Sequence, residues 1–86
     1  MFVVVTYDVN AKRIPAVEKF LRRYLAHVQN SVFEGELGKA EIDEIESGLK
    51  RIISPDQDSV RIYIFERRGC VRTRSLGAQE DPSEII

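Results

Sequence analysis

Asp8 is the residue whose place in the sequence most suggests chemistry. It ends the run Met1-Phe-Val-Val-Val-Thr-Tyr, which starts with five apolar residues. Val and Thr favour extended backbone, and a run without polar alternation is typical of a strand covered on both faces. A carboxylate at the tip of a buried strand either caps the next helix or belongs to a site. Spacing alone favours the cap.

The site interpretation of Asp8 is a divalent metal. Mg²⁺, or Mn²⁺ in its place, prefers hard oxygen ligands, and Mg²⁺ often uses only one or two protein carboxylates. A single Asp8 supplies few ligands, but a two-fold axis between two copies of the chain would bring two carboxylates to one cation. The sequence offers no HExxH motif and no Cys/His cluster to add ligands.

Basic residues gather in two segments, although the net charge of the chain is only −1. The segment 61–74 holds five arginines against the single acid Glu66, and the segment 12–23 is also rich in Lys and Arg. Such segregation predicts a face that binds nucleic-acid phosphates in a salt-dependent, largely sequence-blind manner. An equally weighted alternative is that these basic residues only form the solvated faces of a strand and a helix. The candidate phosphate ligands are Lys12, Arg13, Arg72 and Arg74.

Other reactive side chains give weaker signals. His27 is the only histidine and has no nucleophile elbow or phosphate loop beside it, so we expect a solvated loop histidine. Cys70 is the only cysteine, which excludes an intrachain disulfide and suits a reducing compartment. Three further residues either lie beside the strand tip or pack in the core, and spacing leaves both options open: Tyr7, Ser31 and Phe33.

The composition indicates one small domain. The chain has 86 residues, of which 43% are hydrophobic and 31% charged. A chain of this length buries about 60–65% of its unfolded surface, so the monomer should be marginal and an oligomer is favoured. The N-terminal run lacks the basic start of a signal peptide, and no apolar stretch approaches the roughly 20 residues that cross a bilayer. We therefore expect a cytoplasmic protein without membrane contact.

Two amphipathic helices are expected to cover the first strand. Apolar residues at helical spacing predict one helix over 12–25, with Asn10 as its N-cap. A second stripe predicts a helix from Gly38 to about Ile53, ended by the Ser-Pro pair that follows.

The strands are predicted from β-branched and alternating residues. Residues 28–37 form either one kinked strand or a hairpin that folds back near Glu34-Gly35. Residues 59–65 form a further strand, and 70–76 alternate in a way that predicts a hairpin partner for it.

This order of elements predicts an α+β fold of the form β-α-β-β-α-β, the ferredoxin-like two-layer sandwich. We expect a domain over 1–78, followed by a linker and a short last strand over 79–86. Ile85 and Ile86 end a polar linker, so they should not lie exposed. They could add to the edge of the chain's own sheet or of a partner's sheet.

Three segments carry a family resemblance: 3–9 (VVVTYDV), 27–37 (HVQNSVFEGEL) and 58–63 (DSVRIY). Their order and spacing resemble the CRISPR-associated Cas2 family, the small spacer-acquisition subunit. The similarity extends along most of the chain, and the block QNSVFEGEL is its most specific part.

The resemblance implies a homodimer in which the last strand of each chain completes the partner's sheet. It implies that this dimer bridges two dimers of the CRISPR integrase and holds a short DNA duplex, and that some members have metal-dependent nuclease activity on RNA or DNA. The key carboxylate of the family falls on Asp8, so the metal interpretation overtakes the cap, with Mg²⁺ as the expected cofactor. Tyr7, Ser31 and Phe33 carry over as neighbours of that site.

Two hypotheses of different class follow. In the first, the protein is an adaptor of CRISPR adaptation that binds duplex DNA and docks the integrase. In the second, paired Asp8 carboxylates hold Mg²⁺ and the dimer is an endonuclease that hydrolyses single-stranded RNA or duplex DNA. A more distant alternative is a toxin-like, metal-dependent endoribonuclease with the same fold.

Overall fold

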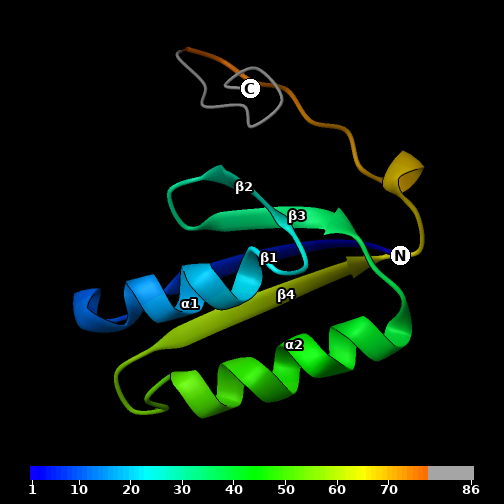
Figure 1. Cartoon of the computed structure of the whole chain (residues 1–86). Helices are drawn as coiled ribbons and strands as arrows, with labels where there is room; N and C mark the ends of the chain where they lie inside the picture. The colour runs from blue at the N-terminus through cyan, green and yellow to red at the C-terminus, as the bar shows by residue number, and fades with distance from the viewer. Residues whose placement is uncertain (78–86) are drawn as a thin grey trace.

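A four-stranded antiparallel sheet with two helices on one face forms the body of the protein in the computed structural model, which describes residues 1–77 (Figure 1). The elements are β1 (Phe2–Asp8), a 3₁₀ turn (Ala11–Arg13), α1 (Ile14–Leu21), β2 (Ala26–Gln29), β3 (Val32–Glu36), α2 (Lys39–Ile52) and β4 (Ser59–Phe65). The strand order β2-β3-β1-β4 places the apolar β1 in the middle. The predicted β-α-β-β-α-β order is confirmed.

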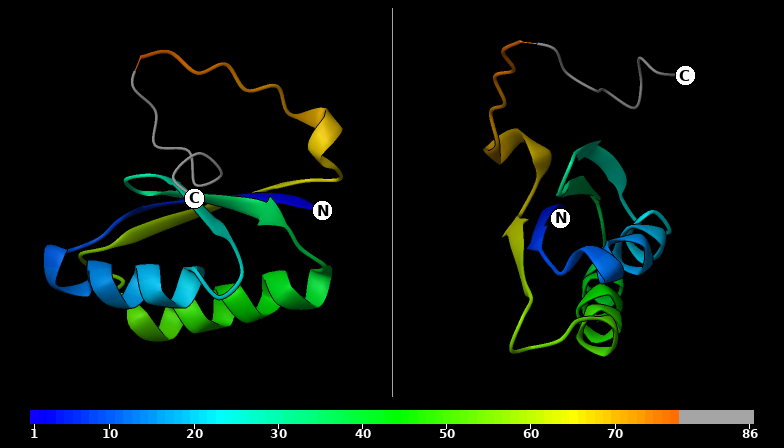
Figure 2. Two further views of the ribbon diagram at one scale, coloured as in Figure 1. Left: turned by 45° about the horizontal axis from the view of Figure 1, so that its top comes forward. Right: turned by 90° about the vertical axis from the view of Figure 1, so that its left-hand side faces the viewer.

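The core lies between the sheet and the two helices (Figure 2). Alternate residues of β1 point into it, and Val3 and Val5 are fully buried. The helices contribute apolar side chains at helical spacing, among them Leu21 and Ile45, which are also fully buried. Each such side chain stabilises the fold by about 1.5–3 kcal/mol on burial. Among residues 1–77, no helix covers the other face of the sheet.

Both helices are confirmed, but α1 is shorter than predicted. Asn10 caps the 3₁₀ turn through a bond from the Lys12 N–H to its Oδ1 (3.1 Å). After Leu21 the helix ends in a tighter turn, in which the Tyr24 N–H donates to the carbonyl three residues before it, that of Leu21 (3.0 Å). The chain then enters β2. None of the described helices is long and apolar enough to cross a membrane.

Residues 26–36 form a hairpin whose turn is not where the glycine suggested. The strands β2 and β3 meet at Asn30-Ser31, whereas Gly35 lies inside β3. A Cβ on Gly35 would lie 3.1 Å from Leu25 Cδ2, so the glycine allows the close approach of that core side chain. The predicted turn near Glu34-Gly35 was therefore wrong.

The predicted hairpin between 59–65 and 70–76 is also wrong. A short 3₁₀ turn (Arg68–Cys70) follows β4, and residues 71–75 then run outside the two layers and form no strand (Figures 1 and 2). This stretch alternates like a strand, but its arginines and hydroxyl side chains offer the sheet no apolar face. Within the described residues, β4 is thus an edge strand. The expected last strand at 79–86 lies outside them.

Candidate metal and nucleic-acid site

Asp8 is the last residue of β1, on the face of the sheet away from the helices. Side chains alternate along a strand, and Val3, Val5 and Tyr7 are buried toward the helices. Asp8 therefore falls on the open face, at the end of the strand, opposite Ser59 of β4. Two sheets that packed through their open faces could bring two copies of Asp8 together.

The carboxylate of Asp8 is exposed and has no capping role. The cap of the following turn is Asn10, and among residues 1–77 no hydrogen bond or ion pair holds the Asp8 side chain. A charge left free at the tip of the central strand is available for a ligand. The cap interpretation of Asp8 is therefore wrong.

A recess of about 430 Å³ adjoins Asp8 at this end of the sheet. Tyr7, Glu18 and His27 contribute to its wall, and the turn Asn30-Ser31 closes one side. The Ser31 carbonyl accepts a bond from the Tyr7 N–H (3.2 Å), which fixes the turn against β1. The structure thus brings two of the predicted neighbours, Tyr7 and Ser31, beside Asp8.

The third predicted neighbour, Phe33, is a core residue. Its ring is fully buried, and it stacks on the His27 ring with centroids 4.3 Å apart and planes 4° apart. It supports the recess from the core side, through this stack and through a tilted packing with Tyr7 whose centroid lies 6.2 Å away.

A polar network under the recess connects α1 with the β2–β3 turn. The Tyr7 hydroxyl donates to Glu18 Oε2 (2.7 Å) and also lies 2.9 Å from the Asn30 carbonyl oxygen. His27 Nε2 lies 2.8 Å from the same carbonyl. Burial, and then the bond to Glu18, raise the pKa of Tyr7, so this phenol stays a neutral donor.

Sequence reasoning missed Glu18 and misplaced His27. The histidine is part of β2 and its side chain is only 27% exposed, so it is not a solvated loop residue. The one available signal for Glu18 was its isolation, because it is the only acid between Lys12 and Arg23.

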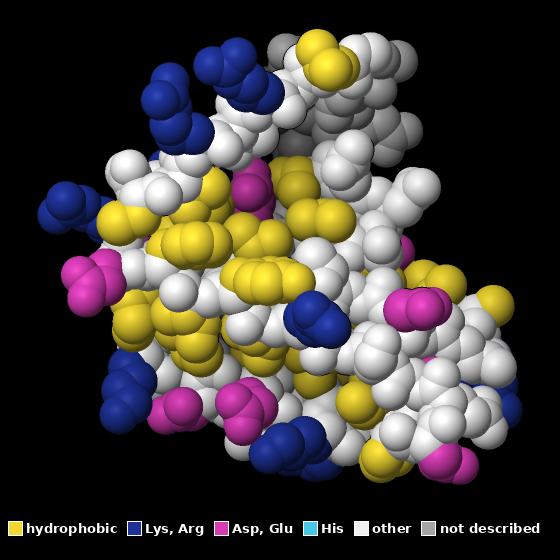
Figure 3. Space-filling model, turned by 180° about the vertical axis from the view of Figure 1, so that it is seen from behind, with side chains coloured by type: hydrophobic (Ala, Val, Ile, Leu, Met, Phe, Trp, Pro, Cys, Tyr) yellow, Lys and Arg dark blue, Asp and Glu magenta, His cyan; other side chains and the backbone are white. Residues whose placement is uncertain are grey.

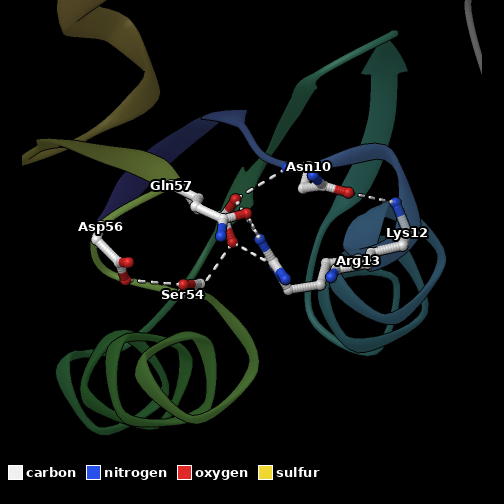
Figure 4. Close-up of polar contacts among 7 residues, drawn as sticks. Asn10, Lys12, Arg13, Ser54, Asp56 and Gln57 are labelled. Atoms are coloured by element: carbon white, nitrogen blue, oxygen red, sulfur yellow. Dashed lines mark hydrogen bonds and ion pairs between the residues drawn. The ribbon is translucent and has the colours of Figure 1, made fainter.

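Arg13 does not present a free guanidinium to solvent. It binds Asp58 through Nε (2.5 Å) and Nη2 (3.0 Å) (Figure 4). The Asp58 side chain is fully buried. The backbone N–H groups of Asn10 and Ser54 complete the coordination of that carboxylate, each at 2.8 Å. We call this arrangement the Asp58 clasp.

The Asp58 clasp holds the start of the first helical segment against the turn before β4. The Arg13 guanidinium, helped by the two backbone donors, keeps the pKa of Asp58 well below its usual range. Gln57 adds a further bond to Arg13 Nη2 (3.1 Å). This geometry gives Arg13 a structural role, so the predicted phosphate contacts rest on the other basic residues.

The remaining predicted phosphate ligands are exposed. Lys12 lies in the turn after Asp8, whereas Arg72 and Arg74 lie on the extended segment after β4. That segment is attached to the sheet where the Arg68 guanidinium covers the Phe2 ring at 4.8 Å. We call residues 67–74 the basic arm.

The open face of the sheet carries an apolar patch. Seen from behind, hydrophobic side chains gather over the sheet, with Lys and Arg at the margin (Figure 3). Tyr63 of the edge strand β4 is 43% exposed on this face, opposite Val4 of β1. Patches of this kind on a small protein mark interaction surfaces.

One chain alone does not provide a complete metal site. Within residues 1–77, no group of three or more His, Cys, Asp or Glu side chains could hold an ion. The acidic pair near 56–58 does not help, because Asp58 belongs to the clasp and Asp56 accepts a bond from the Ser54 hydroxyl (3.0 Å). The free Asp8 carboxylate is a hard oxygen ligand of the kind that Mg²⁺ or Mn²⁺ prefers, and a second chain would add a second one.

The sequence of this chain is similar to that of known proteins. Residues 1–73 match the family described as CRISPR associated protein Cas2. A protein of Pyrococcus furiosus named CRISPR-associated endoribonuclease Cas2 is 48% identical over 86 residues, covering 100% of this chain and 99% of its own. The Archaeoglobus fulgidus protein named CRISPR-associated endoribonuclease Cas2 2 is 46% identical over 80 residues, covering 93% and 87%.

Solved structures show the same fold. A crystal structure of a Cas2 protein superposes with a TM-score of 0.88 at 49% identity, covering 95% of this chain and 92% of that one. The Streptococcus pyogenes Cas2 crystal structure gives a TM-score of 0.80 at 40% identity, covering 90% and 100%. The ferredoxin-like α+β fold and the sequence together show that this chain belongs to the CRISPR-associated Cas2 family.

Proposed function

We propose that this protein acts in CRISPR spacer acquisition as a homodimer that holds duplex DNA and bridges two dimers of the CRISPR integrase. The observation that carries the proposal is the open sheet face, where an apolar patch, the edge strand β4 and the Asp8 carboxylate lie together. Membership of the Cas2 family supports the biological setting.

The dimer forms through the two open faces and is completed by the last residues of each chain. In this proposal 1–78 is the folded domain and 79–86 is a linker with a strand that pairs on the partner's β4. Two features support it: β4 has a free edge among the described residues, and Tyr63 of that strand is exposed on the open face. Burying an Ile side chain stabilises by about 1.5–3 kcal/mol.

Deletion of residues 82–86 tests this dimer. The truncated protein should shift toward monomer on dilution in sedimentation velocity, while Ile85→Val/Ile86→Val, which keeps two β-branched apolar residues, should stay dimeric. A truncated dimer as resistant to dilution as the full chain would contradict the proposed strand exchange.

Duplex DNA is held by the basic arm and by Lys12. Arg72 and Arg74 are exposed and lie on an extended segment outside the sheet, where their charges can follow a phosphate backbone. The recess beside Asp8 is a poor place for phosphates, because its lining has two carboxylates, Asp8 and Glu18, and no Lys or Arg. The surface that binds the DNA phosphates is thus separate from the surface that carries Asp8.

Metal-dependent hydrolysis of RNA or DNA is the second candidate function. Relatives at 46–48% identity are named endoribonucleases, and the Asp8 carboxylate is free of intrachain partners within 1–77. The two Asp8 carboxylates of the dimer would hold Mg²⁺, or Mn²⁺, which when bound supplies an activated water. The protein's own residues position the strand: the basic arm binds phosphates, and Tyr7 with Glu18 keeps the β2–β3 turn in place.

Asp8→Asn separates the two functions. Asn has nearly the same shape as Asp but lacks the charge that a hard cation requires. We expect the variant to fold, to dimerise and to support integrase-dependent insertion of spacer DNA, while any Mg²⁺-dependent cleavage collapses.

Two results would contradict this assignment. Full cleavage by pure Asp8→Asn protein would remove the carboxylate from the chemistry. Loss of spacer insertion by a well-folded dimer would show that the metal position serves the adaptor. The toxin-like alternative predicts cleavage by the dimer with no requirement for this protein in spacer insertion.

A further inference from the structure

A second recess lies between α1 and α2, on the opposite side of the molecule from the open sheet face. Its volume is about 420 Å³. Gly48 of α2 makes it possible, because a Cβ there would lie 2.6 and 2.8 Å from Phe20 Cε1 and Cε2 and nearer still to Cζ. The absent side chain lets the Phe20 ring lie directly against α2. We call this recess the helix groove.

The floor of the helix groove is a pair of aromatic rings. Phe20 and Tyr24 are half-buried and tilted, with centroids 5.5 Å apart. The Tyr24 hydroxyl donates to Glu44 Oε2 (3.0 Å), which fixes that ring. The Arg23 guanidinium lies 5.9 Å from both centroids, so these ring faces already attract a guanidinium within the chain.

Two carboxylates of α2, those of Asp43 and Glu44, line the helix groove. Within the described residues, Asp43 makes no hydrogen bond or ion pair. Arg51 lines the other end, about 12 Å further along the helix. The charge of the groove is therefore polarised, and a cation from a ligand would be drawn to the Asp43 end and repelled from the Arg51 end.

We propose that the helix groove docks an arginine of a basic segment of a partner protein. Aromatic faces beside carboxylates complement a guanidinium, which stacks on rings and donates paired bonds from its edge to carboxylate oxygens. Arginine is also the charged residue most enriched among energetic anchors of interfaces. The carboxylates oppose a phosphate backbone, so charge favours a basic polypeptide over nucleic acid.

The position of the helix groove allows this docking while the dimer is assembled. The helices cover one face of the sheet, and the apolar patch lies on the other (Figures 2 and 3). The groove would remain accessible when two open faces pack together. The inference goes beyond DNA binding and hydrolysis and depends on neither.

The test uses the full-length protein, labelled with ¹⁵N, and an acetylated peptide of repeated Ala-Arg-Leu-Arg units. We expect saturable shifts centred on the amides of Gly48 and Tyr24. Asp43→Asn/Glu44→Gln should weaken peptide binding roughly three- to tenfold, since each exposed ion pair is worth only a modest free energy. Gln at 44 still accepts the Tyr24 hydroxyl bond, so the groove should keep its shape.

The matched control is Glu46→Gln/Asp56→Asn, which removes the same charge from exposed positions that do not line the groove. It should bind the peptide as the wild type does. Equal weakening in both variants would mean general charge attraction and would overturn the proposal, as would the absence of saturable binding. The free dimer could also associate with further copies of itself. If only the groove variant abolished that association, the occupant of the groove would be a second copy of this chain, and the proposal would again be overturned.

Discussion

Gly48→Ala probes how tightly the helix groove is packed. Alanine is favoured over glycine inside a helix by about 1 kcal/mol, so the substitution would stabilise α2 at an open position. Here the new methyl would lie 2.6 and 2.8 Å from two Phe20 ring atoms, well inside the ordinary carbon contact distance of about 3.5–4.0 Å. Overpacking of this kind costs about 1–3 kcal/mol.

The two effects give a net prediction. Because the Phe20 ring is half-buried, it can pivot outward, which places the overpacking cost near the middle of its range. Gly48→Ala should therefore lower the free energy of unfolding by about 1 kcal/mol. In a Phe20→Ala background the clash is gone, and Gly48→Ala should raise the free energy of unfolding by about 1 kcal/mol. The difference is a coupling energy of about 2 kcal/mol.

Urea unfolding at fixed dimer concentration measures all four members of this cycle. Ser47→Ala, at the exposed neighbouring position, serves as the control and should be slightly stabilising in both backgrounds. If Gly48→Ala stabilised the wild type by the full helix-propensity gain, the Phe20 ring would move without cost. The groove would then lack a fixed aromatic floor.

Two further substitutions test the electrostatic assignments. The clasp depresses the pKa of Asp58, so the stabilisation that the ionised carboxylate gives the fold is present above about pH 4 and is lost as the pH falls further. The urea midpoint of the wild type should therefore drop more steeply toward pH 2 than that of Asp58→Asn. Equal slopes would show that the clasp plays no part in acid unfolding. Arg72→Glu/Arg74→Glu should weaken duplex binding and flatten its salt slope by roughly one unit per lost contact. Lys39→Glu/Lys50→Glu on α2 makes the same charge change and should leave the slope unaltered; equal loss in both would place the phosphate surface elsewhere.

The strands and helices that bury an apolar stripe could be predicted from the sequence. The unbroken run before Asp8 required cover on both sides, and the stripes of α1 and α2 supplied the layer over one of them. The end of α1 could not be predicted, because Leu25 continues the apolar stripe. The chain leaves the helix so that this side chain can pack against Gly35, a contact that only the tertiary fold creates.

The candidate site was only partly predictable for a similar reason. Asp8 was recognised by its place at the tip of a strand, but Glu18 and His27 reach the same recess through the fold alone. Arg13 was read as a surface cation, whereas it pairs with Asp58, 45 positions away. The alternation in 70–76 predicted a strand, yet a strand forms only where a neighbour with a matching face exists.

The stoichiometry of divalent metal binding tests most directly the claim that two copies of Asp8 meet in the dimer. Mn²⁺ titration followed by electron paramagnetic resonance, with Mg²⁺ as competitor, counts the bound ions, and sedimentation in the same buffer counts the chains. We predict one competed Mn²⁺ per two chains in the wild type and none in a dimeric Asp8→Asn protein. One ion per chain, or unchanged binding in Asp8→Asn, would contradict a site shared across the two-fold axis.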